Sequence, residues 1–152
     1  MLLMSRIALS LLLLISGSMF AVTVQTQQSI TLQKKREFTA RFLLYLPEGY
    51  QEKKESKCPL IIFLHGAGER GDNLNRVKVH GPPKLVEQGK EFPFIIVSPQ
   101  CPKKQRWDDV MLTILLDHIC KEYRVDTSRL YLTGLSMGGY GSWSLGMALC
   151  DR

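Results

Sequence analysis

The sequence has 152 residues, of which 45% are hydrophobic and 22% charged, a composition that suits one folded domain and excludes a disordered chain. Lysine and arginine outnumber aspartate and glutamate by 20 to 14, which gives a net charge of +6. The basic residues are scattered and form no basic helix with interleaved aromatic residues, so the sequence favours a solvated surface and not nucleic-acid binding.

The first 21 residues have the pattern of a secretory signal peptide. Arg6 precedes an apolar run at residues 7–15, and the small residues Ser18 and Ala21 both offer cleavage positions. The run is short for a membrane span, and an uncleaved anchor is the alternative interpretation. We therefore predict a signal peptide at residues 1–21 and an exported domain, secreted or periplasmic, at residues 22–152, with no stable membrane insertion after cleavage.

Four apolar segments predict the first strands of the domain. Residues 22–35 alternate weakly between apolar and polar side chains, and residues 38–47 form a stronger strand pattern. Residues 60–64 and 92–98 are continuous apolar runs, which are typical of strands buried on both faces of a parallel sheet.

Helices are expected between and after the later strands. One is predicted from Pro83 to about Gly89, and Asp108 or Asp109 is expected to cap another of about fourteen residues. After a turn at residues 126–128, an apolar run at 130–132 predicts a further strand. The order of strands followed by strand–helix units predicts an α/β protein with a parallel sheet and right-handed crossovers.

The chain is organised around the sequence GLSMG at residues 134–138, which lies between the last predicted strand and a helical pattern. A serine at such a junction, with glycine two positions to either side, matches a nucleophile elbow, although an ordinary glycine-rich turn is the alternative. The sharp turn would expose the Ser136 hydroxyl, and the N–H of Met137 would begin the helix without an intrahelical acceptor. We expect the methionine and aromatic positions of that helix to be core residues.

A second motif, HGAGERG at residues 65–71, directly follows the buried run at 60–64. Acyl-transfer enzymes with a nucleophile elbow take one oxyanion donor from the residue after the nucleophile and one from the loop after the third strand. Glycines at positions 66 and 68 would let the backbone of this loop approach a substrate. The two motifs together favour a catalytic function over a loop without a role.

Four segments and Trp107 together form a recognisable pattern; the segments are PLIIFLHGAGERGDN, HGPPKL, FPFIIVSPQCP and YRVDTSRLYLTGLSMGGYGSW. With them the sequence resembles the secreted α/β-hydrolase esterases often called predicted peptidases, which are similar to polyhydroxybutyrate-depolymerase-like and feruloyl-esterase-like enzymes. The resemblance covers about residues 41–149 and implies an α/β-hydrolase fold, with Ser136 as the nucleophile and the N–H groups of Ala67 and Met137 as the oxyanion hole.

Several polar residues near the motifs have two interpretations. We expect His65 to shape the loop and not to act as the catalytic base, and we assign no catalytic role to His80 or His118. Trp107 could line the substrate cleft or cover the edge of the sheet.

The acidic and basic residues of the loop at 65–71 and just after it also leave two interpretations open. Glu69, Arg70 and Asp72 could pair and fix the loop, which is the interpretation we favour. In the alternative, Arg70 could meet a substrate carboxylate.

In this fold the catalytic acid and base follow the serine in the chain. Beyond Ser136 the sequence offers only Asp151 and no histidine, so we expect it to be the N-terminal part of a serine hydrolase that acts on carboxylic esters through an acyl-enzyme. The substrate would be a small acyl compound or an ester on a polysaccharide or polyester. The alternative is a non-catalytic exported remnant or binding domain that retains the elbow.

The remaining motifs imply no cofactor. No dinucleotide fingerprint, phosphate loop or metal-ligand cluster occurs in the sequence, so we predict no metal site. Export would permit disulfides among the four cysteines Cys58, Cys101, Cys120 and Cys150, but the spacing favours no pairing. The sequence does not define the oligomeric state.

Overall fold

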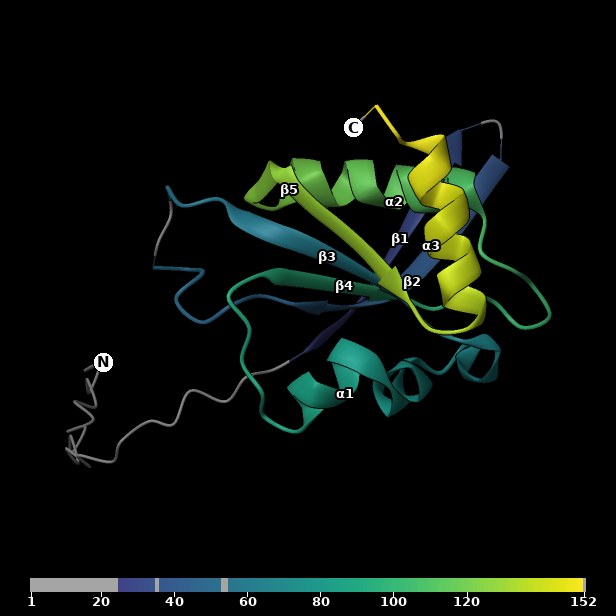
Figure 1. Cartoon of the computed structure of the whole chain (residues 1–152), viewed down its shortest axis with the longest axis horizontal. Helices are drawn as coiled ribbons and strands as arrows, with labels where there is room; N and C mark the ends of the chain where they lie inside the picture. The colour runs from purple at the N-terminus through teal and green to yellow at the C-terminus, as the bar shows by residue number, and fades with distance from the viewer. Residues whose placement is uncertain (1–24, 35, 53–54, 152) are drawn as a thin grey trace, which may run out of the picture.

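The computed structural model describes residues 25–34, 36–52 and 55–151 (Figure 1). The signal peptide predicted for residues 1–21 lies outside the described residues. Among the helices within them, none combines the length and the apolar composition that crossing a bilayer would need.

Five strands form one mixed sheet in the order β1-β2-β4-β3-β5. The pairs β1–β2 and β2–β4 are antiparallel, whereas β3 pairs in parallel with β4 on one side and with β5 on the other. The parallel half carries the continuous apolar runs of the sequence, as predicted for strands that are covered on both faces. The strands are β1 (Thr26–Lys34), β2 (Arg36–Tyr45), β3 (Cys58–Leu64), β4 (Ile95–Pro99) and β5 (Val125–Gly134).

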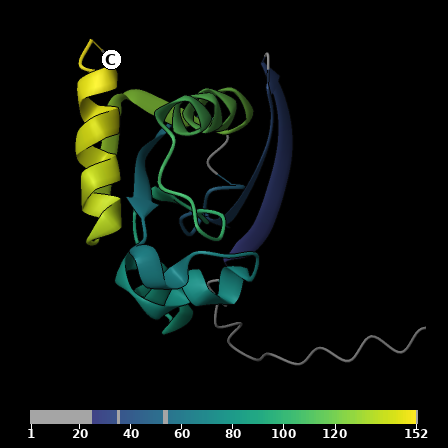
Figure 2. The same cartoon turned by 90° about the vertical axis from the view of Figure 1, so that its right-hand side faces the viewer.

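Helices cover both faces of the sheet: in Figure 1, α2 lies above the strands, α1 lies below them, and α3 runs beside the end of β5. Turning the molecule shows α3 beside the edge formed by β5 (Figure 2). The α-helices are α1 (Gly81–Glu87), α2 (Asp109–Glu122) and α3 (Met137–Ala148), and two 3-10 helices, η1 (Ala67–Glu69) and η2 (Leu74–Val79), follow β3.

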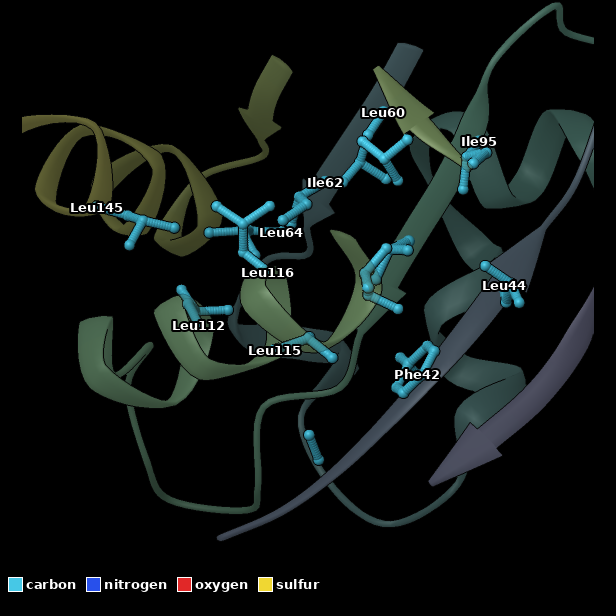
Figure 3. Close-up of a cluster of buried hydrophobic side chains, with 14 of the residues drawn as sticks. Phe42, Leu44, Leu60, Ile62, Leu64, Ile95, Leu112, Leu115, Leu116 and Leu145 are labelled. Atoms are coloured by element: carbon cyan, nitrogen blue, oxygen red, sulfur yellow. The ribbon is translucent and has the colours of Figure 1, made fainter. Parts of the chain in front are cut away.

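Alternation along β2 divides the core between the two faces. Phe42 and Leu44 point into the larger cluster with α2, whereas Leu43 and Tyr45 belong to clusters with η2 and α1. Figure 3 shows leucines of β3, α2 and α3 converging in the larger cluster. This packing fixes the two strand ends, those of β3 and β5, that carry the glycine-rich motifs.

The helix caps and the last strand refine the sequence predictions. Asp108 is the N-cap of α2, because its Oδ1 accepts the N–H of Met111 at 2.8 Å. The turn predicted at residues 126–128 lies inside β5, where Asp126 accepts the N–H of Ser128 and the strand register against β3 shifts. Our prediction that a separate turn precedes the strand was therefore wrong, because β5 begins before this irregularity and continues after it.

The cysteines form no disulfide in the described part of the chain, where Cys101 is buried and Cys150 is exposed. Burial raises the pKa of the Cys101 thiol to about 11, so it stays protonated and packs as a small apolar group.

Candidate active site

Ser136 joins β5 to α3 with φ of 53° and ψ of −112°. Residues other than glycine rarely adopt this backbone conformation. The glycines two positions away permit this sharp turn. A Cβ added at Gly134 would overlap the backbone of Gly138, and one added at Gly138 would overlap the carbonyl of Leu64. The packing of α3 against the ends of β3 and β5 therefore requires glycine at both positions, as the sequence predicts for an elbow.

The two backbone N–H groups that the sequence singles out both begin helices. Met137 is the first residue of α3 and Ala67 is the first residue of η1, so neither N–H has an intrahelical acceptor. Both residues line the same cleft as Ser136, which has a volume of about 660 Å³. A Cβ added at Gly66 would lie 3.8 Å from the Cβ of Ser136, which shows how closely the loop after β3 approaches the elbow.

Side chains from three segments hold the loop after β3. Arg70 donates from Nε to the carbonyl of Ala67 at 2.9 Å, and Arg76 donates to the carbonyl of Gly68 at 2.7 Å. Buried Gln100 donates from Nε2 to the carbonyls of Glu69 and Asn73 at 2.8 and 2.9 Å. Neither Arg76 nor Gln100 was identified from the sequence, because each lies outside the glycine-rich motif and contacts it only after folding.

Our expectation that Glu69, Arg70 and Asp72 pair with one another was wrong. Within the described residues, Arg70 forms no ion pair, and its guanidinium binds backbone carbonyls. Glu69 instead lies 3.9 Å from both His65 and His80. The loop is thus fixed mainly by arginine and glutamine bonds to carbonyls.

His65 is fully buried behind the loop, and both of its ring nitrogens are engaged. Nε2 accepts the N–H of Cys101 at 3.0 Å, so the proton lies on Nδ1, which donates to the carbonyl of Gly66 at 2.6 Å. Burial lowers the pKa of His65, and this effect outweighs the nearby charge of Glu69. His65 therefore shapes the loop, as expected, and has no free nitrogen to act as a base.

Trp107 is among the residues that line the cleft with Ser136. Its indole N–H donates to the carbonyl of His65 at 3.2 Å, and its ring packs against Gly141 of α3. The side chain thus links the loop before α2 to both glycine-rich segments.

Sequence reasoning missed several residues that line the cleft. Tyr140 and Ser144 follow Ser136 at intervals of four on α3, so helical spacing could have identified them. We had expected the aromatic and methionine positions of this helix to be core, which was wrong for three of them. Tyr140 is 82% exposed and Trp143 is 73% exposed, and Met147 is exposed as well. The residues that line the cleft are Ala67, Arg70, Arg106, Trp107, Ser136, Met137, Tyr140, Gly141 and Ser144.

No histidine or carboxylate is among those lining residues, which all belong to the described part of the chain. His80 is half exposed beside Glu69, and His118 lies on α2. Asp109 contacts the wall of the cleft, because its Oδ2 accepts the hydroxyl of Ser144 at 2.6 Å.

This architecture is the α/β-hydrolase fold. A thermostable esterase superimposes with a TM-score of 0.66 and 26% identity over 82% of this chain and 38% of that one. A ferulic acid esterase gives 0.62 and 26%, over 84% of this chain and 56% of that one. A ferulic acid esterase from the anaerobic fungus Anaeromyces mucronatus gives 0.59 and 22%, with coverage of 89% and 58%.

Comparison with curated sequences also finds similarity to an esterase. No family model matches the chain. A bifunctional acetylxylan esterase/xylanase from Neocallimastix patriciarum is 30% identical in an alignment of 92 residues, and the match covers 53% of this chain and 12% of that protein. The chain thus spans a small part of this curated relative and between 38 and 58% of the three solved esterases.

Proposed function

We propose that this chain carries the nucleophile and both oxyanion donors of a serine hydrolase that cleaves carboxylic esters. The observation that carries the proposal is the position of Ser136. Its strained backbone places it in one cleft with two N–H groups, those of Met137 and Ala67, that begin helices. The 26% identity to two solved esterases supports an ester as the substrate.

In the proposed reaction, the Ser136 Oγ bonds to the ester carbonyl carbon while a general base takes its proton. The carbonyl electrons move onto the oxygen, and the N–H groups of Ala67 and Met137 stabilise the resulting anion. Collapse breaks the bond to the alcohol, which leaves with the proton from the base. Water then attacks the acyl-enzyme by the same steps, releasing the acid and regenerating Ser136.

The base and the acid that orients it are proposed to follow Arg152 in the encoded protein. Two observations support this proposal: no histidine lines the described cleft, and β5 lies at the edge of the described sheet. Sequencing the source DNA beyond the codon for Arg152 tests it. An open frame that encodes an aspartate or glutamate and then a histidine, each after an apolar strand, would support it, and a stop codon would overturn it.

The proposed substrates are esters of small acyl groups, polysaccharides or polyesters. The acetylxylan esterase and ferulic acid esterase names among similar proteins support the polysaccharide class. We also propose that residues 1–21 direct export of the domain at residues 22–152, so that it meets such substrates outside the cytoplasm.

Labelling with a fluorophosphonate tests the nucleophile in the whole encoded protein. The reagent phosphonylates an activated serine hydroxyl and expels fluoride, so we expect one label on Ser136 and none on the Ser136→Ala variant. The Ser144→Ala variant is the matched control, because it removes another hydroxyl from the same cleft and should retain the label. Equal labelling of the unsubstituted protein and of the Ser136→Ala variant would overturn the assignment of Ser136 as the nucleophile.

A further inference from the structure

Two arginines, Arg70 and Arg106, line the cleft that contains Ser136. Guanidinium groups remain charged at any physiological pH, and no carboxylate is among the described residues that line the cleft. Neither arginine forms an ion pair with an acidic side chain in the described part of the chain. The cleft therefore presents two positive charges that form no ion pair with any described acidic side chain.

Arg70 is held in a fixed orientation. Its Nε donates to the carbonyl of Ala67 at 2.9 Å and its Nη1 donates to the carbonyl of Gln105 at 3.1 Å. A guanidinium has five N–H donors, so three remain for a ligand. Neutral carbonyl acceptors orient the group without cancelling its charge, and little side-chain freedom is left to lose on binding.

Two carboxylates that adjoin lining residues are directed toward other partners. Asp109 accepts the hydroxyl of Ser144, and Glu69 lies beside His65 and His80. Neither acidic residue lines the cleft. Their charges reduce the positive potential around the cleft but leave the two guanidinium groups as its only charged lining among the described residues.

We propose that Arg70 and Arg106 bind a carboxylate carried by the ester substrate, so that the enzyme prefers acidic esters over their neutral counterparts. Two-pronged N–H donation from arginine matches the geometry of a carboxylate. Trp107 and Tyr140 in the same lining offer flat apolar surface to the rest of such a molecule. This proposal rests on the proposed esterase function for the nature of the ligand, and Ser136 is not needed for the binding itself.

Binding to the whole encoded protein tests the proposal without turnover. The Ser136→Ala variant prevents acylation, so isothermal titration calorimetry measures the affinity of each ligand for the cleft at equilibrium. The ligands are para-acetoxybenzoate and para-acetoxybenzamide, which have nearly the same shape and differ in charge. We expect the carboxylate to bind about tenfold more tightly at low salt, and the preference to shrink as salt is added.

Arginine variants identify the source of the preference. Arg106 is exposed and makes no described hydrogen bond, so Arg106→Gln should reduce the preference several-fold without disturbing the loop. Arg70→Lys keeps the positive charge but removes the paired N–H donors of the guanidinium, and it should also reduce the preference for the carboxylate. Lys103→Gln, an exposed neighbour outside the lining, is the matched control for net charge and should retain the preference.

The outcomes separate this proposal from the proposed function. Equal affinity for the two ligands, or a preference that survives both arginine variants, would overturn the carboxylate site even if fluorophosphonate labels Ser136. A preference lost in Arg106→Gln and kept in Lys103→Gln would support the site even if labelling fails, in which case the hydrolase assignment alone would be withdrawn.

Discussion

The indole N–H of Trp107 donates to the backbone carbonyl of His65 across 3.2 Å, and the two rings lie 4.8 Å apart at 60°. This relationship connects the loop before α2 to the end of β3, immediately before the proposed oxyanion donor Ala67. On its other side, Trp107 packs against Gly141 of α3. The side chain of Trp107 therefore contacts both α3 and the segment after β3, and it helps to set the distance between them.

Two glycines of α3 should respond in opposite ways to substitution by alanine. At Gly141 an added Cβ would lie 2.7 Å from Trp107 Cδ1 and 2.9 Å from its Cβ, so the whole indole would have to move. At Gly146 nothing lies within 4 Å. We expect Gly141→Ala to lower the free energy of unfolding by about 1–2 kcal/mol and Gly146→Ala to raise it by up to about 1 kcal/mol. Urea unfolding measures both, and equal effects would contradict the described contact.

Burial of His65 should make the stability depend on pH. Its pKa in the folded protein is lowered from 6.5, so below that pH the unfolded chain binds a proton that the folded protein does not. The stability is therefore fully present above about pH 6.5 and should fall by up to about 1.4 kcal/mol per pH unit as the pH decreases toward the lowered pKa. Urea unfolding at pH 7.5, 6.5 and 5.5, values chosen at roughly unit spacing around that pKa, measures this slope.

Two variants separate His65 from other titrating groups. His65→Asn should reduce the slope, whereas Trp107→Phe removes the hydrogen bond to the same residue and should lower stability at every pH by about 1 kcal/mol without changing the slope. If His65→Asn does not fold, the ring signals of His65 in the unsubstituted protein provide the readout. A His65 ring that is still half protonated at or above pH 6.5 in the folded protein would contradict the lowered pKa.

The sequence predicts the elbow better than the surroundings of the elbow, and the reason is the range of the interactions. Ser136 and its two glycines are constrained by a local turn, so their spacing alone indicates the conformation. Gln100 and Arg106 reach the site only because β4 and the following loop end beside β3, an arrangement that no local pattern encodes.

The same distinction explains the error on α3. Spacings near three and four predict an apolar face, and a helix after an elbow packs that face against the sheet. In the described structure the buried face of α3 instead consists of Gly138, Gly141 and Leu145, because close approach to β3 and Trp107 needs small residues. The large apolar residues Trp143 and Met147 consequently lie on the opposite side, which is exposed.

Backbone strain at Ser136 should be measurable as a difference in the free energy of unfolding between two variants at this position. With φ of 53° and ψ of −112°, a residue with a Cβ costs about 1–3 kcal/mol that glycine does not. Alanine usually stabilises relative to glycine, by about 0.4–1 kcal/mol where its backbone is unstrained. We therefore expect Ser136→Gly to be more stable than Ser136→Ala by about 1 kcal/mol, reversing the usual order. Urea unfolding of the two variants tests this expectation, and a more stable alanine variant would show that the elbow is not strained.

Apolar surface near β5 and α3 should cause the polypeptide of residues 22–152 to self-associate when it is produced on its own. Tyr131 of β5 and Met147 of α3 are 55% and 60% exposed, and Trp143 lies on the same helix as Met147. Exposed large apolar side chains of this kind, beside an edge strand of the described sheet, favour association in water.

The double variant Trp143→Gln, Met147→Gln should therefore shift the sedimentation profile toward monomer. Val110→Gln is the matched control, because this α2 residue is 56% exposed and belongs to none of the described core clusters. Sedimentation velocity over a range of concentrations distinguishes the outcomes. An unsubstituted polypeptide that stays monomeric, or a Val110→Gln variant that dissociates equally well, would show that the surface of α3 does not drive association.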